Sequence, residues 1–162
     1  MKKLIFFIFY TYLFSINIPQ YFHSNFVQTI TSKHTLLYKG ELYFSNNKVL
    51  WHYTYPEEKY ILINKNVLIY EPDLMQVEIR KRANISLKDI LKNAKKVKET
   101  LYKAKLNNKL IYFEFNKTLK QIYYTDEVGN RVKIDFINPS LKKFSENSFN
   151  LKIPSDVDYI KE

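Results

Sequence analysis

The chain has 162 residues, of which 46% are hydrophobic, 17% aromatic and 26% charged. This length allows one domain of ordinary size, and so much apolar side chain excludes a disordered or low-complexity chain. Two glycines, Gly40 and Gly129, are too few for the glycine-rich loops that cradle phosphates. The absence of cysteine excludes disulfides, thiolate nucleophiles, cysteine-ligated metals and lipidation at cysteine.

The charge balance is strongly basic, with 26 basic and 16 acidic residues and a formal net charge of +10. Two explanations remain open. One is an anionic partner, and the other is a genome biased toward lysine codons, which also accounts for the abundance of Ile, Asn, Tyr and Phe. The charge alone therefore does not predict nucleic-acid binding.

The first 18 residues have the pattern of a secretory signal peptide. Lys2 and Lys3 precede a mostly apolar run, residues 4–18, which Pro19 closes. A membrane-spanning helix needs about 20 apolar residues, so a permanent anchor is a weaker alternative, as is a buried first element. We predict a signal peptide over 1–18 with cleavage between 15 and 21, a single domain over 19–162, and a location in the periplasm.

Residues 22–81 alternate between apolar and polar side chains with a period of two, which predicts antiparallel strands. Asn46-Asn47 and Asn64-Lys65-Asn66 supply turns, and Gly40 marks a bulge or a close approach of two backbones. The expected strands are 22–31, 34–45, 48–55, 58–63, 67–71 and 74–81.

A single helix follows. Ser86 can cap it, and its apolar residues recur at helical spacing from Leu87 to Val97, so the predicted helix covers 86–98. Its other positions are rich in lysine: Lys88, Lys92, Lys95, Lys96 and Lys98. These lysines are read either as a solvated face or as a surface that meets anionic headgroups or an acidic partner.

The strand pattern then returns over 100–106, 109–115, 119–125, 131–137 and 148–153, which gives about eleven strands. A sheet of this size tends to curl, and one helix cannot cover all of its apolar face. The pattern therefore predicts a mainly β (α+β) protein with a curved antiparallel sheet and a partly unfilled concave cavity. A fully packed barrel or sandwich is the commoner outcome of such patterns and stays open as the alternative.

The side chains expected on the apolar face are candidates to line a cavity, although each, Trp51 included, is also suited to an ordinary core. The set is Val49, Trp51, Tyr53, Ile61, Ile63, Met75, Val77, Ile79, Ile111, Phe113, Phe115, Val132, Ile134 and Phe136.

Chemistry-bearing residues do not form a recognisable set. The three histidines, His23, His34 and His52, lack metal-ligand spacing, and the adjacent carboxylates 57–58 and 126–127 fall at turns where solvated charge is expected. The sequence therefore predicts no metal, no cofactor and no enzymatic activity.

Several segments, in order, resemble the outer-membrane lipoprotein carrier (LolA) family. Trp51, Pro56, Gln76 and Pro154 are in register with the family's pattern, and the likeness covers residues 21–160. The segments that carry it are 22–28, 40–44, 49–56, 60–64, 68–77 and 149–158.

The resemblance implies an incomplete β-barrel with a short helical lid, and a periplasmic chaperone whose apolar interior holds the acyl chains of lipoproteins. Three acyl chains have on the order of 45 methylenes, so their exposure to water would cost roughly 35 kcal/mol at about 0.8 kcal/mol each. The implied partners are acylated lipoproteins, an inner-membrane ATP-driven transporter, and an outer-membrane acceptor or the membrane itself, with a monomeric carrier and no nucleic acid. A lipid- or lipopeptide-sensing module of the same architecture is the alternative.

The lid implied by the resemblance is the predicted helix, through Leu87, Ile90, Leu91 and Ala94. The chain departs from the family in two places. Only about five residues separate the signal from the first strand, where the family has an amino-terminal helix. The family's latching arginine near the Trp-bearing strand is also missing, and Lys48 is the basic residue available for that role.

Overall fold

The computed structural model describes residues 16, 18–46, 48–82, 87–106 and 108–161. The predicted signal peptide therefore lies outside the described residues, except for Ile16 and Ile18, and so does Ser86, the predicted helix cap.

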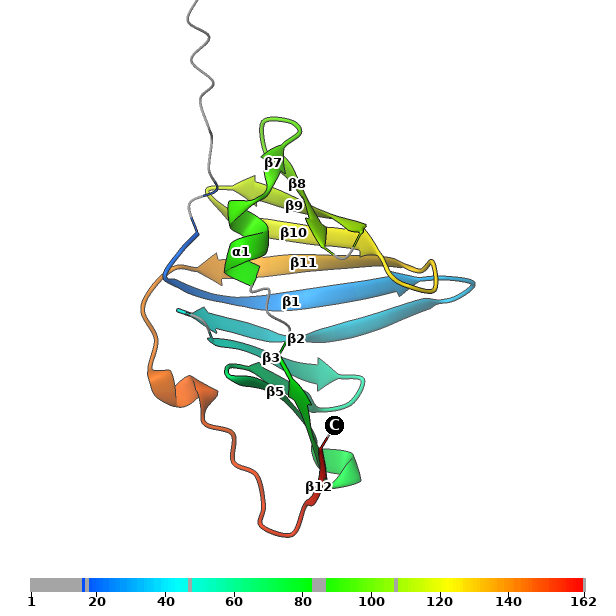
Figure 1. Cartoon of the computed structure of the whole chain (residues 1–162), viewed down its shortest axis with the longest axis vertical. Coiled ribbons are helices and arrows are strands. Elements are labelled where there is room, and N and C mark those ends of the chain that lie inside the picture. The colour runs from blue at the N-terminus through cyan, green and yellow to red at the C-terminus, as the bar shows by residue number, and fades with distance from the viewer. Residues whose placement is uncertain (1–15, 17, 47, 83–86, 107, 162) are drawn as a thin grey trace, which may run out of the picture.

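In the described part of the chain, twelve strands form one sheet in the order β12-β6-β5-β4-β3-β2-β1-β11-β10-β9-β8-β7 (Figure 1). The two end strands are not paired with each other, so the sheet is open and is not a closed barrel. This confirms the predicted fold class. The strands are β1 (Tyr21–Thr31), β2 (Thr35–Ser45), β3 (Lys48–Tyr55), β4 (Lys59–Ile63), β5 (Asn66–Glu71), β6 (Gln76–Lys81), β7 (Lys95–Lys96), β8 (Leu101–Leu106), β9 (Lys109–Asn116), β10 (Thr118–Thr125), β11 (Arg131–Ser140) and β12 (Asp158–Lys161).

Two meanders meet at β1. One runs from β1 to β6 and the other from β7 to β11, and β1 pairs antiparallel with both β2 and β11. The last strand, β12, returns to the far end and pairs parallel with β6. Among the described residues, no helix is both long and apolar enough to cross a membrane.

The helix α1 (Leu87–Lys92) is shorter than predicted. Asn93 still donates to the carbonyl oxygen of Asp89, through its N–H at 3.2 Å and its Nδ2 at 2.9 Å, but the N–H of Ala94 donates to the carbonyl oxygen of Leu91 at 3.2 Å, which tightens and ends the last turn. The chain then enters the β7–β8 hairpin, where the N–H groups of Val97 and Lys98 donate to the carbonyl oxygen of Leu101. Lys95 and Lys96 instead form the edge strand β7.

The predicted strand over 148–153 is also wrong. Residues Glu146–Phe149 form a 3-10 helix, η2, in which the Ser145 hydroxyl accepts from the Asn147 N–H at 3.2 Å. Residues 150–157 form no ladder, and pairing resumes at Asp158. A second 3-10 helix, η1 (Pro72–Leu74), joins β5 to β6.

We call the face of the sheet that α1 covers the inner face. Paired residues lie on the same face of an antiparallel sheet, and the pairs Phe26–Gly40 and Gly40–Tyr53 place these residues of β1, β2 and β3 on it. Gly40 confirms the predicted close approach, because a Cβ at Gly40 would overlap the carbonyl oxygen of His52. The ladder beside it has a bulge on β3, where the two steps from Tyr53 to Tyr55 face the single step from Gly40 to Lys39.

The outer face is backed over one half of the sheet by the C-terminal strap, which we define as residues 141–157. The ring of Phe144 lies edge-on to Tyr21 and Tyr43, with centroids 5.7 and 5.4 Å away. Further along, Val157 packs with Tyr70 and Val77 in a second apolar cluster. Figure 1 shows the strap running from β11 to β12 beside the β2–β6 half of the sheet.

Candidate functional site

The inner face is a continuous apolar surface from β8 to β4. It contains eleven of the fourteen predicted cavity residues: Val49, Trp51, Tyr53, Ile61, Ile63, Ile111, Phe113, Phe115, Val132, Ile134 and Phe136. Aromatic rings meet at its centre, where Phe26 lies edge-on to both Trp51 and Tyr53 with centroids 5.1 Å away. Trp51 and Tyr53 are half-buried, so this surface is not a fully closed core.

The structure does not bring Val77, Ile79 and Met75 into this surface, and their predicted placement beside Trp51 is corrected. Val77 pairs with Tyr70 and Tyr70 with Tyr60. Since Tyr60 in turn pairs with His52, this row lies on the outer face, where Val77 and Ile79 pack near the strap. Met75 lies in a turn with a positive φ of 49° and is exposed.

The physical reason for this error is that alternation within one strand defines two faces but does not say which one points inward. In β6 the apolar alternates point outward because the strap supplies a second apolar surface there. The inner side of this end carries charges instead, such as Lys59 and Glu71, which form an ion pair at 2.7 Å.

The prediction missed apolar inner-face residues on four strands, β1, β2, β8 and β10. In β1 the buried residues Phe22 and Phe26 follow the same alternation as the residues that were predicted, so period two in this strand could have found them. In β10 a register shift between Leu119 and Gln121 hides the pattern. The missed set is Phe22, Phe26, Ile30, Leu42, Phe44, Tyr102, Ala104, Leu119, Ile122 and Tyr124.

The helix α1 covers part of this surface. Leu91 is 4% exposed and belongs to the inner-face core, and Ile90 and Ala94 pack against it. The side chain of Leu87, the fourth predicted lid residue, lies outside the described part of the structure. The three described lid residues therefore face the apolar surface, as a cover must.

Ile16 and Ile18 also cover the inner face. Ile16 is 7% exposed within the inner-face core, and Ile18 packs against the same cluster. Ile18 also lines a small hollow of about 280 Å³ together with Phe44 and Lys88. Both residues belong to the predicted signal peptide over 1–18.

Lys48 does not reach this cover, so its predicted role as a latch is corrected. Its Nζ lies 3.0 Å from Oε2 of Glu146, and the ammonium lies over the ring of Phe149 at 5.6 Å from the centroid. Glu146 also accepts from the hydroxyl of Ser45 at 3.0 Å. Lys48 therefore fastens the C-terminal strap and not α1.

The polar groups on the inner face are satisfied internally. The hydroxyl of Tyr53 donates to Oε1 of Gln28 at 2.9 Å. Burial raises the pKa of Tyr53 to about 12, with the neighbouring phenols of Tyr124 and Tyr38 as smaller causes. Tyr53, Gln28 and Ile61 line a hollow of about 240 Å³ at the β3–β4 end of this face. The phenol therefore stays neutral at physiological pH beside the apolar surface.

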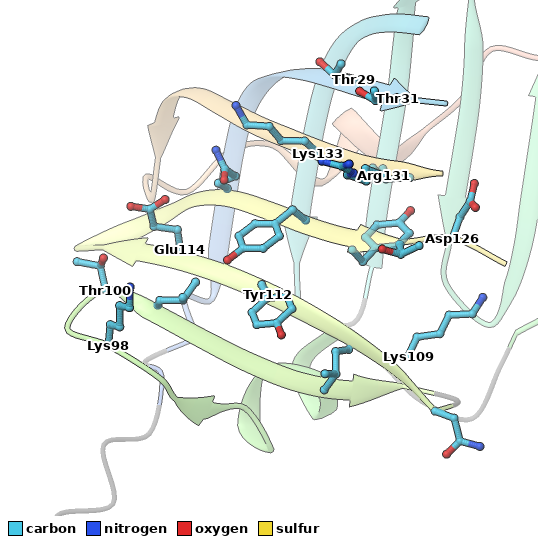
Figure 2. A pocket seen from close by; sticks show the side chains of 18 residues that line it. Thr29, Thr31, Lys98, Thr100, Lys109, Tyr112, Glu114, Asp126, Arg131 and Lys133 are labelled. Atoms are coloured by element: carbon cyan, nitrogen blue, oxygen red, sulfur yellow. The ribbon is translucent and has the colours of Figure 1, made fainter. Parts of the chain in front are cut away.

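A much larger hollow, of about 1220 Å³, lies on the outer face (Figure 2). It crosses β1, β11, β10 and β9, and its wall is polar and aromatic. Tyr112 and Tyr123 stack on each other with centroids 4.9 Å apart, and Arg131, Lys133 and Lys98 lie along its sides. This groove is open and carries charged side chains beside its aromatic rings, in contrast to the inner face.

Among the described residues, no group of three His, Cys, Asp or Glu side chains is arranged to hold a metal ion. Of the predicted histidines, His52 forms a contact of 3.1 Å between its Nε2 and Oε1 of Glu58, on the outer face. Tyr60 donates to the same oxygen at 2.6 Å, and these two hydrogen bonds, that of Tyr60 first, lower the pKa of Glu58.

One open antiparallel sheet, apolar on its inner face and covered there by a short helix, defines the half-barrel class of proteins. The sequence model of one protein family, the outer membrane lipoprotein carrier protein LolA, matches residues 19–101 of this chain. An outer-membrane lipoprotein carrier protein of Campylobacter jejuni is 38% identical, with 99% of this chain and 100% of the relative covered. The chain therefore belongs to the LolA family of outer-membrane lipoprotein carrier proteins.

Two further comparisons agree. A carrier protein of the same name from Wolinella succinogenes is 31% identical, with 87% of each chain covered. The crystal structure of a conserved protein from Thermus thermophilus superposes with a TM-score of 0.56 at 13% identity, covering 90% of this chain and 93% of the other. That likeness concerns the fold alone.

Proposed function

We propose that this protein is a periplasmic chaperone that binds the acyl chains of lipoproteins on its inner face and carries them from the inner to the outer membrane. The observation that supports this most is the apolar surface from β8 to β4. Among the described residues it is covered by α1 and by Ile16 and Ile18, and the latter two belong to the predicted signal peptide. A surface of this kind suits hydrocarbon, and the relatives that share the family carry the name of lipoprotein carriers.

Cargo takes the place of the protein's own cover. Exposing one buried leucine such as Leu91 costs about 2 kcal/mol, and burying about three acyl methylenes offsets this at about 0.8 kcal/mol each. The exchange therefore costs little once an acyl chain makes contact along a few carbons. The remaining methylenes of the chain then supply the net affinity.

The partners follow from this role. Lipoprotein is received from an ATP-driven transporter in the inner membrane and passed to an acceptor in the outer membrane or to that membrane itself. The carrier performs no covalent step in this account. Its work is to keep the acyl chains away from water between the two membranes.

The test is binding of a fluorescent acyl probe, followed by its displacement with a triacylated peptide and with the same peptide lacking acyl chains. We expect the triacylated peptide alone to displace the probe. Ile61→Glu places a carboxylate on the half-buried inner face, and because that charge must be desolvated beside hydrocarbon, probe affinity should fall by about tenfold or more.

The matched control is Ile137→Glu. Ile137 pairs with Asn25 on the outer face and is 43% exposed, so this variant should bind the probe like the wild type. Leu50, which also points outward, is unsuitable because it is only 3% exposed. Equal displacement by both peptides, or equal loss in both variants, would contradict the proposal.

A further inference from the structure

The end of the molecule formed by α1, β7 and β8 is unusually rich in lysine. We call residues 87–106 the lysine-rich end. It contains seven lysines, two acidic residues (Asp89 and Glu99) and no arginine. Half of the chain's formal net charge therefore lies in about an eighth of its length. The seven are Lys88, Lys92, Lys95, Lys96, Lys98, Lys103 and Lys105, and all are exposed.

Most of these charges are not compensated. Elsewhere in the described chain, lysines such as Lys109 and Lys133 form ion pairs with Glu127 and Asp135, at 2.8 and 3.1 Å. Within the described residues, no ion pair is formed by six lysines of the lysine-rich end, which are Lys88, Lys92, Lys95, Lys98, Lys103 and Lys105.

The arrangement is unfavourable for an isolated protein. Lys95 of β7 and Lys103 of β8 are direct cross-strand partners, a position at which like charges destabilise a sheet. β7 is the last strand of the sheet, so the charges lie at one extremity of the molecule, as Figure 1 shows. Val97, in the loop between these strands, is 43% exposed with a lysine on each side. An anionic partner would relieve the repulsion.

We propose that the lysine-rich end docks onto the surface of a membrane that contains anionic phospholipids. This inference rests on the proposed function, because a carrier of acyl chains has to meet a membrane or its components at both ends of its path. Lysines near an anionic bilayer each contribute favourably, and an exposed apolar side chain among them can enter the interface.

Two observations favour a membrane over an acidic protein. All basic residues of the lysine-rich end are lysines, and protein interfaces are depleted in lysine and enriched in arginine. The lysines are also spread over a helix, an edge strand and a second strand, which suits the diffuse charge of a headgroup layer better than a folded partner. Lys98 alone among them reaches the rim of the outer groove (Figure 2).

The docked orientation places α1 at the bilayer. Lys88 and Lys92 belong to the same short helix as Leu91, which covers the inner face. Headgroups that hold these lysines therefore also hold the helix that must move when an acyl chain enters or leaves. Docking and opening of the cover thus occur at the same end of the molecule.

The test is co-sedimentation of the cargo-free mature protein with phosphatidylcholine vesicles, with or without phosphatidylglycerol. We expect binding only to the anionic vesicles, with an affinity that falls as salt is raised. The variant K95Q/K98Q/K103Q/K105Q should bind these vesicles about tenfold more weakly or worse.

The matched control is K142Q/K143Q/K152Q/K161Q, which removes the same charge from four exposed lysines of the C-terminal strap and β12, outside the lysine-rich end. It should keep most of the affinity for anionic vesicles. Equal weakening of both variants would overturn the proposal, because net charge and not its location would then govern binding. Failure of the wild type to bind anionic vesicles would also overturn it and would point to an acidic protein as the partner.

Both quadruple variants should bind the acyl probe as the wild type does, and this separates the two proposals. Loss of vesicle binding with intact probe binding concerns the lysine-rich end alone. Absence of probe binding in the wild type, with vesicle binding retained, would overturn the proposed function and not the membrane surface. Circular dichroism of each variant shows that the fold is intact.

Discussion

Gly40 shows how tightly the sheet is packed at single residues. A Cβ there would overlap the backbone carbonyl of His52 and lie 2.9 Å from the Phe26 ring. We expect Gly40→Ala to destabilise the fold by about 3 kcal/mol, at the high end of overpacking effects. Gly129→Ala, at a positive φ of 87° with open space around it, should cost only about 1 kcal/mol. Urea unfolding of both variants checks this, and similar costs would contradict it.

Tyr53 should make stability depend on alkaline pH. Burial raises its pKa to about 12, whereas an unfolded tyrosine ionises near pH 10. Between these values the folded state holds a proton that the unfolded state has lost, so stability is full below about pH 10 and falls as pH rises toward 12.

Tyr53→Phe should therefore lose less of its free energy of unfolding between pH 9 and pH 11 than the wild type loses. The substitution also removes the hydrogen bond to Gln28, which should lower stability at neutral pH by about 1 kcal/mol. Urea unfolding at both pH values measures the difference. An identical alkaline loss in the two proteins would show that Tyr53 is not the group responsible.

For single residues, the alternation of apolar and polar side chains correctly predicted which residues of one strand share a face. Val49, Trp51 and Tyr53 share a face, as expected. The pattern could not tell inward from outward in β6, because apolar side chains lie under the strap there. It also could not predict the role of Lys48, which depends on Glu146 almost a hundred residues away.

Among the helices and strands, α1 shows where the spacing of apolar residues misleads. Apolar residues at helical spacing continue to Val97, but the helix ends at Lys92 because the chain tightens at Ala94 and turns into the β7–β8 hairpin. The strand expected over 148–153 is replaced by η2 and by residues that form no ladder. Both differences arise from local backbone hydrogen bonds that apolar periodicity does not record.

The movement of α1 is testable because the chain has no cysteine. Leu91→Cys introduces a single thiol at a position that is 4% exposed, so it should react slowly with a thiol reagent in the cargo-free protein. Addition of triacylated peptide should raise its rate by about tenfold or more, since opening governs the access of a buried group. The unacylated peptide should have no effect.

The control for this measurement is Lys92→Cys, on the exposed neighbour of Leu91. Its thiol should react quickly with and without acylated peptide, because it does not contact the inner face. If Leu91→Cys labels at the same rate in both conditions, α1 does not move when cargo binds. The helix would then be a fixed part of the core.

The whole molecule divides at β1 into two unlike halves. The β2–β6 half has the C-terminal strap on its outer face and ends at β12, which pairs with β6 (Figure 1). The β7–β11 half has α1 on its inner face and an open groove on its outer face. The open sheet with one apolar face could be predicted from strand number and alternation. The strap could not, because its contacts join residues distant in sequence.

The central claim is that acyl chains bind on the inner face of the sheet. Photo-crosslinking with a triacylated peptide that carries a photoreactive group within one acyl chain tests it most directly, with the labelled residues identified by mass spectrometry. The account predicts labels on inner-face residues such as Trp51, Ile61 and Phe115, and their loss in Ile61→Glu. Labels confined to the outer groove, at Tyr112 or Tyr123, would contradict it.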